Sequence, residues 1–370
     1  MPKRLSAVDC VSPAMAQTKK QLFSPFRWGR WLRLALICLL TGEGAGGGGG
    51  GPPIGNFNLP SLPTPHGKDG TTTALLAIPH VDWGTILPWL PWIAVGVVLL
   101  FALFFLWIYI ASVFRFVLFD SVLHDRCTFK GSWTQWEPCG RSYFFWSIVL
   151  FLATGLGTGL IIGIPALIAW RAGLLEHPDD HVALLILGGL VFFLILVVFV
   201  VAAAVTALFA KDFCVPIMAM EKIGIMDAWR RFVPMLAGEK MAFTGYVLMK
   251  IVLTIAAAII VGIATVLIFL FLLIALAIAG AIIFFGGKAI GLTFNVATIS
   301  ILVVLGGVIF AGLLYVVGLI NTPAMVFFQA YTQYFIGSRY PPVGEILFPP
   351  PPEPPPPTHD APPVPEPSIG

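Results

Sequence analysis

One uncharged stretch constrains this chain more than any other feature. Ile251 to Phe285 contains no charged side chain over thirty-five consecutive positions, and it is flanked by Lys250 and Lys288. At about 1.5 Å per helical residue, the stretch is longer than the ~30 Å hydrocarbon core of a bilayer. A helix that is apolar on every side has no polar face to turn toward water, so the stretch predicts a membrane-spanning helix.

Four further uncharged runs support the same prediction: Trp83–Phe114, Ser142–Trp170, Val182–Ala210 and Ala289–Ser338. The 370 residues are 58% hydrophobic and only 11% charged, and the mean hydropathy is +0.94. These values depart from those of soluble domains in the direction of membrane proteins. The sequence therefore predicts an all-α, polytopic transmembrane helical bundle with about six spans.

Composition divides the chain into four regions. Residues 1–43 are expected to form a cytoplasmic amphipathic segment followed by a short first membrane helix. Residues 44–82 contain a glycine run and several prolines, which is typical of a flexible linker. Residues 83–340 are expected to form the transmembrane helical domain, and the proline-rich residues 341–370 a disordered tail.

The first of these helices has three interpretations. Arg27, Arg30 and Arg33 recur every third residue on roughly one helical face, just before the apolar segment Leu34–Leu40. Residues 23–42 are therefore interpreted as a short crossing helix with arginines at the headgroups, as an interfacial amphipathic helix, or as the apolar part of a signal peptide. The short apolar segment leaves all three open.

The distribution of positive charge predicts the orientation. Lys and Arg number seven in residues 1–33, four in 113–141, five in 211–240 and one in the tail, which makes seventeen of the twenty-one. The positive-inside rule then places the amino and carboxyl termini and both basic loops in the cytoplasm, for a multi-pass protein of the cell (inner) membrane.

The number of crossings made by residues 241–285 stays open, because this run fits one overlong helix or two short ones. A loose internal repeat favours one crossing. Similar segments at 116–119, 213–216 and 321–323 each leave a predicted helix, and copies of one unit belong on the same side of the membrane.

Several segments resemble a known family. Residues 19–23 (KKQLF), 25–36 (PFRWGRWLRLAL), the glycine run to Gly51 and residues 113–121 (VFRFVLFDS) look like an uncharacterised family of bacterial and archaeal integral membrane proteins. The spacing of the helices and Pro-bearing loops is also distantly similar to the membrane domain attached to some bacterial glycerophosphoryl diester phosphodiesterases. The resemblance implies a bundle of about six helices, no established activity, and no catalytic residue that can be carried over.

Groups that could bind a metal are few. His177 and His181 flank two carboxylates with a spacing that metal sites use, but Pro178 and the expected loop favour a solvated turn. His124, Cys127 and Cys139 lack a fourth close ligand. We therefore expect no metal site, no cofactor and no catalytic residue. The five cysteines form no CxxC pair and are expected to be reduced thiols: Cys10, Cys38, Cys127, Cys139 and Cys214.

Charged residues near the predicted cytoplasmic face are expected to form ion pairs with one another. The acidic residues Asp120, Asp125, Glu137 and Asp212 are expected to pair with Arg115, Arg126 and Arg141. Ion-coupled carriers place ionisable residues within their spans, whereas here the spans contain none away from their ends, where Lys250 lies. The faces of small residues, such as Gly155, Gly159 and Gly163, are expected to pack helices against each other.

These observations predict a non-enzymatic structural or accessory component of the cytoplasmic membrane, with a role in lipid or envelope organisation. The alternative is a channel or carrier for a small or apolar solute. Arg230, Arg231 and Lys240 are the predicted lipid-headgroup contacts. The expected partners are membrane lipids and a membrane protein or a second copy of the chain. Nucleic acid is not expected, because its binding needs a larger basic field.

Overall fold

The protein is described from a computed structural model that covers residues 4–24, 27–42, 90–125, 131–173, 182–289 and 296–349. Within these ranges every regular element is a helix. Five helices are long and apolar enough to cross a membrane: α4 (Leu90–Leu123), α5 (Ser132–Arg171), α6 (Val182–Phe209), α9 (Lys240–Ala289) and α10 (Val296–Gly337). The predicted all-α polytopic architecture is confirmed.

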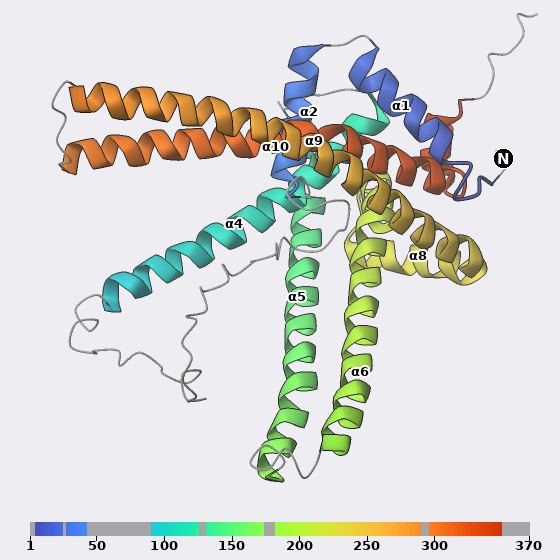
Figure 1. The fold of residues 1–370 in the computed structure, drawn as a ribbon. Helices are drawn as coiled ribbons and strands as arrows, with labels where there is room; N and C mark the ends of the chain where they lie inside the picture. The colour runs from blue at the N-terminus through green and yellow to red at the C-terminus, as the bar shows by residue number, and fades with distance from the viewer. Residues whose placement is uncertain are drawn as a thin grey trace, which may run out of the picture.

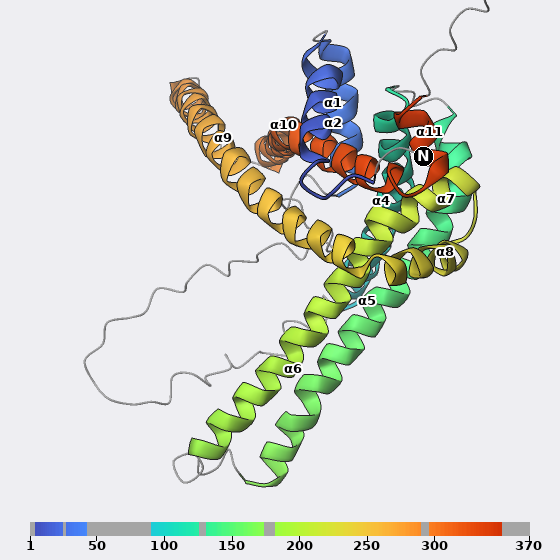
Figure 2. The ribbon, with the colours of Figure 1, turned by 90° about the vertical axis from the view of Figure 1, so that its right-hand side faces the viewer.

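The long helices meet at one end and spread apart at the other (Figures 1 and 2). We call the junction the hub. It comprises the adjoining ends of the long helices and five short helices: α1 (Val11–Phe23), α2 (Trp28–Leu40), α7 (Val215–Glu221), α8 (Ile225–Gly238) and α11 (Pro341–Leu347). Three arms leave it in different directions: α4 alone, the α5–α6 hairpin and the α9–α10 hairpin (Figures 1 and 2). We define the arms by the described residues 90–111, by 147–173 with 182–209, and by 251–289 with 296–314.

Aromatic side chains dominate the core of the hub. Phe213 and Phe232 stack with ring centroids 5.1 Å apart and planes inclined by 8°. The rings of Tyr246 and Phe335 lie 4.6 Å apart, and all four side chains are almost completely buried. Rings of this size bury a large apolar area and prefer offset or tilted contacts, so they hold the helix ends together.

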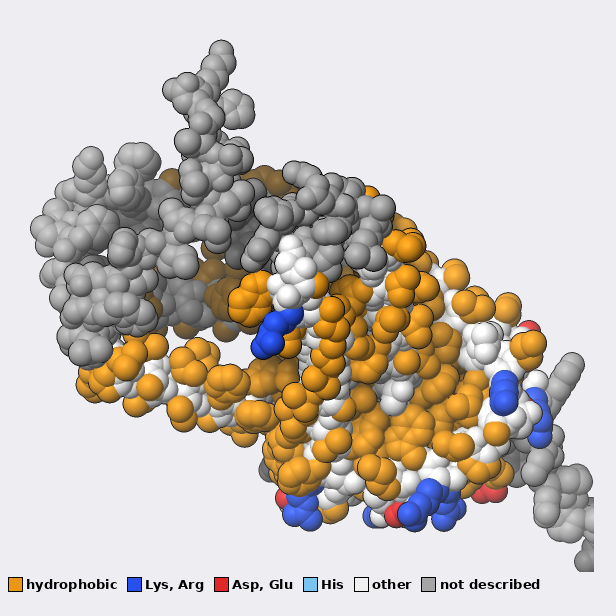
Figure 3. Space-filling model, turned by 90° about the horizontal axis from the view of Figure 1, so that it is seen from below, with side chains coloured by type: hydrophobic (Ala, Val, Ile, Leu, Met, Phe, Trp, Pro, Cys, Tyr) orange, Lys and Arg blue, Asp and Glu red, His pale blue; other side chains and the backbone are white. Residues whose placement is uncertain are grey.

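In the arms, unlike the core of the hub, the apolar side chains are not buried within the chain. In four of the five long helices none of the most apolar eighteen-residue stretch is buried within the chain, and in α10 the buried share is 6%. Hydrophobic side chains cover most of the described surface in Figure 3, and most of the visible Lys and Arg side chains lie toward its margins. The expected packing role of Gly155, Gly159 and Gly163 is wrong within this chain, because nothing lies within 4 Å of a Cβ built at any of them.

A π-helical turn, Ala210–Cys214, ends α6 inside the hub. Pro216 follows it and has no N–H to donate to the carbonyl four residues earlier, which is consistent with wider hydrogen bonding there. Helix α7, which follows this turn, is largely buried, and α8 presents an exposed polar face.

Helix α2 docks onto α10 at a proline. Pro323 cannot donate to the carbonyl of Leu319, and Trp31 Nε1 donates to that oxygen instead, at 3.5 Å. Tyr315 Oη donates to the carbonyl of Leu32 at 3.1 Å. With 13 residues, or about 20 Å, α2 is too short for a full span. It is a short helix packed in the hub.

Three further predictions can be compared with the structure. Residues 241–285 lie in the single helix α9, as the interpretation with one crossing requires. The three repeated exits, at 116–119, 213–216 and 321–323, all lie in the hub. The tail boundary at 341 is wrong, because α11 begins there and packs closely on α10, with Gly344 against the Gly337 carbonyl. The predicted linker and residues 350–370 lie outside the described residues.

Candidate functional site

One ion pair lies deep in the hub. Lys250 Nζ contacts Asp212 Oδ2, and the two side chains are only 5% and 4% exposed. Among the described residues no other ion pair has both side chains buried to this extent. Transfer of two charges out of water is costly, so such a pair needs close geometry and further hydrogen bonds.

Two hydroxyl groups complete this polar cluster. Tyr246 Oη donates to Asp212 Oδ2 at 2.9 Å and lies 2.8 Å from Thr332 Oγ1, which itself donates to the Phe328 carbonyl at 3.0 Å. Tyr246 and Lys250 are four residues apart on one face of α9, so both reach the same carboxylate. We call Asp212, Tyr246, Lys250 and Thr332 the buried cluster.

The buried cluster joins three helices. Asp212 belongs to the π-helical turn that ends α6, Lys250 to α9 and Thr332 to α10. It therefore ties the α5–α6 hairpin to the α9–α10 hairpin at their common end. Ionisable groups in membrane-spanning helices are costly and commonly functional. Lys250 lies ten residues into α9 and directly precedes the uncharged run Ile251–Phe285, so it sits near the end of this span, as the sequence predicted.

The ion pairs of Asp212, Asp120 and Asp125 differ from those expected. Asp212 pairs with Lys250 and not with an arginine. Asp120 lies 2.9 Å from His124 Nδ1 one turn away, and Asp125 pairs with Arg30 across the hub. These partners come from distant parts of the chain or from the same helix face, and spacing along the sequence did not distinguish them. Arg126 lies outside the described residues.

Arg115 has an aromatic partner. Its guanidinium Nη1 donates to Tyr143 Oη and its charge lies 4.9 Å from the centroid of the same ring. A cation over an aromatic face is attracted by the ring quadrupole, so this contact joins α4 to α5.

The predicted headgroup contacts lie at the rim of the hub. Arg230 is 82% exposed and pairs with Asp227 at 3.3 Å, and Arg231 pairs with Glu221 at 2.8 Å. Both arginines belong to α8, and the exposed Lys240 begins α9. Each arginine thus faces a carboxylate that offsets part of its charge.

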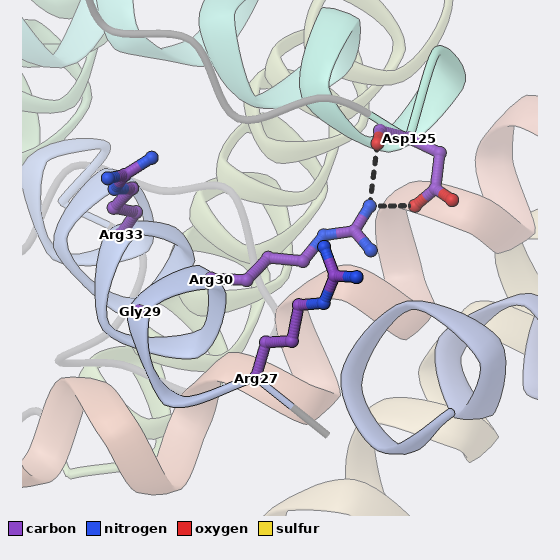
Figure 4. Close-up of a pocket in the computed structure, with 5 residues that line it drawn as sticks. All are labelled: Arg27, Gly29, Arg30, Arg33 and Asp125. Carbon is purple, nitrogen blue, oxygen red and sulfur yellow. Dashed lines mark hydrogen bonds and ion pairs between the residues drawn. The ribbon is translucent and has the colours of Figure 1, made fainter. Parts of the chain in front are cut away.

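A more basic cavity lies at the start of α2. It measures about 530 Å³ and is lined by Arg27, Gly29, Arg30, Arg33 and Asp125 (Figure 4). The sequence placed these three arginines on one helical face. What it did not predict is that the end of α4 supplies the single acidic residue of the lining.

Metal-ligating side chains do not gather in the described part of the chain, which holds no group of three or more His, Cys, Asp and Glu residues suited to a metal. His177, His181 and Cys127 lie outside the described residues. Four cysteines are buried free thiols, which confirms the expectation for Cys10, Cys38, Cys139 and Cys214.

A sequence signal for the buried cluster exists. Lys250 is the one charged residue between Lys240 and Lys288, and a lysine in such an apolar helix needs a nearby acid. Asp212 lies two positions after the uncharged run Val182–Ala210. Tyr246, one turn before Lys250, is the matching polar residue on the same face.

The comparisons with known proteins give a family and no activity. No curated protein and no solved structure matches the chain. The model of a family of unknown function, DUF7544, matches residues 5–346. Since this match covers nearly the whole chain, the protein belongs to the family of unknown function DUF7544.

Proposed function

We propose that the protein is a non-enzymatic structural or accessory component of the cytoplasmic membrane, in which the hub organises lipids or neighbouring envelope proteins. The observation that carries this proposal is the buried cluster. Its charged and hydroxyl groups are used to join α6, α9 and α10. A junction locked in this way holds apolar arms in the bilayer and presents a basic rim at one face.

The charge distribution supports an orientation for this proposal. The described start of the chain and helix α11 both lie at the hub, together with most Lys and Arg residues. Under the positive-inside rule, the hub and both termini would face the cytoplasm. There Arg230, Arg231 and Lys240 would contact anionic headgroups, each with about 1 kcal/mol of attraction.

The partners in this proposal are membrane lipids, and either a membrane protein or a second copy of the chain. A distant relation to the membrane domains that accompany glycerophosphoryl diester phosphodiesterases fits the proposal, and it rests on the spacing of helices and Pro-bearing loops.

Extraction in a polymer disc, followed by mass spectrometry of everything retained, tests the proposal. We expect a lipid or a protein in fixed stoichiometry with the chain. A retained lipid that is lost with Arg230→Ala and Arg231→Ala would assign the contact to α8. If neither a lipid nor a protein is enriched, the accessory role is wrong.

The Lys250–Asp212 pair favours one second candidate, a carrier, because carriers use ionisable groups within their helices. Purified protein in sealed vesicles distinguishes the two. Uptake of a small solute that is abolished by Lys250→Met, in a variant that keeps its thermal stability, would support the carrier and contradict the accessory role.

A further inference from the structure

The cavity at the start of α2 has an excess of positive charge. Three guanidinium groups and one carboxylate line it. Arg30 is held in place, because its Nη2 donates to the Asp125 carbonyl at 2.6 Å and contacts the Asp125 carboxylate as well. Within the described part of the chain, the side chains of Arg27 and Arg33 make no hydrogen bond or ion pair. Two positive charges are therefore left for a ligand.

The geometry suits an oxyanion. The guanidinium groups of Arg27 and Arg30 lie side by side near Asp125, and Arg33 lies apart from them, further along α2 (Figure 4). A planar guanidinium donates two parallel hydrogen bonds to a phosphate, and an anion between two such groups removes their mutual repulsion.

The backbone adds to the same preference. The cavity lies at the amino end of α2, a helix of 13 residues. Gly29 in its first turn has no side chain, and nothing lies within 4 Å of a Cβ built on it, so the backbone of this turn is accessible. Free N–H groups and the helix dipole attract anions at such an end.

The position along the apolar helices favours a lipid over a free anion. At the amino end of α2, Arg30 contacts Asp125, two positions beyond the last residue of α4. Just beyond the other end of α2, Gly42 lies against Trp107, within the apolar part of α4. Leu32 and Leu36, one turn apart on the helix that carries the three arginines, are 37% and 38% exposed. A headgroup at the arginines would thus have apolar side chains next to its acyl chains.

We propose that this cavity binds the phosphate of an anionic glycerophospholipid, with Arg27 and Arg33 as its charged contacts and Arg30 as the residue that Asp125 fixes. This inference deepens the proposed function and rests on it. It moves the most selective lipid contact from α8 to α2, because the arginines of α8 each have a carboxylate partner.

The test uses the full chain in lipid discs of phosphatidylcholine with a minor fraction of phosphatidylglycerol. Native mass spectrometry measures the ratio of the two lipids bound. We expect phosphatidylglycerol to be enriched, and the enrichment to fall roughly tenfold to thirtyfold with Arg27→Gln and Arg33→Gln together. Both side chains are exposed, so the variant keeps its fold.

A matched control removes two other exposed charges of the hub, with Lys19→Gln and Arg141→Gln, and is expected to keep the enrichment. Equal loss in both variants, or no loss in the first, would overturn the proposal. Inorganic phosphate, titrated into discs of pure phosphatidylcholine and followed by phosphorus NMR, tests the other source. Binding as tight as that of the lipid would overturn the lipid assignment.

The failures of the two proposals are distinguishable. If discs retain a lipid or a protein but the enrichment of phosphatidylglycerol does not depend on Arg27 and Arg33, the accessory role holds and the cavity proposal fails. If the vesicles take up solute through the Lys250–Asp212 pair, the accessory role fails, whatever the cavity binds.

Discussion

The hub and the arms use similar apolar residues in opposite surroundings. Gly140 in the hub is so tightly packed that a Cβ on it would lie 2.6 Å from Val113 Cγ2. Gly155, fifteen residues further along the same helix, has nothing within 4 Å. Tyr246 at the start of α9 is completely buried, whereas Ile260 in the same helix is 69% exposed. Burial is therefore set by position relative to the hub.

The hub and the arms are therefore stabilised in different ways. In lipid there is no hydrophobic drive to bring apolar helices together, so the arms need no internal packing, and their backbone groups are satisfied within each helix. The hub needs specific contacts, which the aromatic core, the Lys250–Asp212 pair and the docked α2 supply. Substitutions in the hub should therefore act through lost contacts, and substitutions in the arms through exposure to lipid.

The largest effect is expected at the buried cluster. Asp212→Ala leaves the ammonium of Lys250 buried without the carboxylate it now contacts, which should lower the free energy of unfolding of the hub by about 3–5 kcal/mol. Thermal unfolding in detergent, followed by the fluorescence of the hub tryptophans, measures the change.

Replacement of both charged partners is the control. Asp212→Leu with Lys250→Leu should restore most of the stability, because apolar residues of similar size can replace a buried pair at little cost. If Asp212→Ala alone is harmless, the pair does not join α6 to α9.

A charge in an arm should have the next largest effect. Val198 on α6 is 62% exposed, and Val198→Arg would put a guanidinium against lipid at a cost of about 2.5–3.5 kcal/mol to membrane insertion. Val233 on α8 is 50% exposed at the rim of the hub, and Val233→Arg should change insertion by less than about 0.5 kcal/mol. Insertion assays with a glycosylation reporter compare the two. Equal tolerance would mean that the α5–α6 arm does not face lipid.

The sequence was sufficient for the arms and insufficient for the hub. A run such as Ile251–Phe285 predicts a spanning helix because the thickness of the bilayer sets the required length, and no knowledge of neighbouring helices is needed. The clustering of Lys and Arg at one end of the helices was also predictable, because the charges of each loop are counted without knowing which helices are in contact.

The buried cluster depends on contacts between distant residues. Asp212 and Lys250 are 38 positions apart, and a π-helical turn sets the direction of the acid. Arg30 and Asp125 are 95 positions apart. Nothing in the spacing of either pair distinguishes it from pairings such as Asp212 with Arg141, so the sequence predicted which residues carry charge and not which residues meet.

A smaller effect is expected from a methyl group added to a glycine. Gly140→Ala should destabilise the contact between α4 and α5 by about 1–3 kcal/mol, because the nearest atoms include the Val113 backbone, with Cα at 2.9 Å. Gly155→Ala is the matched change in the arm and should be neutral or favourable by up to about 1 kcal/mol through helix propensity. The two midpoints of thermal unfolding should therefore move in opposite directions. A loss at Gly155 equal to that at Gly140 would mean that this face of α5 packs against protein.

The smallest effect is expected at Cys10, where residues 4–10 meet the hub. Burial raises the pKa of its thiol from the usual 9.0 to about 12, with Arg339 opposing and Asp9 adding to the shift. Because the folded-state pKa is the higher one, this contribution to stability is complete below pH 9 and is lost as the pH rises through about 12.

Alkylation followed by peptide mass spectrometry checks this shift. Cys10 should react slowly in the folded protein from neutral pH up to about pH 9 and quickly after denaturation, since the thiolate is the reactive form. Tyr331→Phe removes the hydrogen bond of 3.0 Å to the Ala7 carbonyl and should raise the rate modestly by loosening this segment. Fast alkylation of the unsubstituted protein at neutral pH would mean that residues 4–10 do not pack on the hub. The hub would then begin at α1.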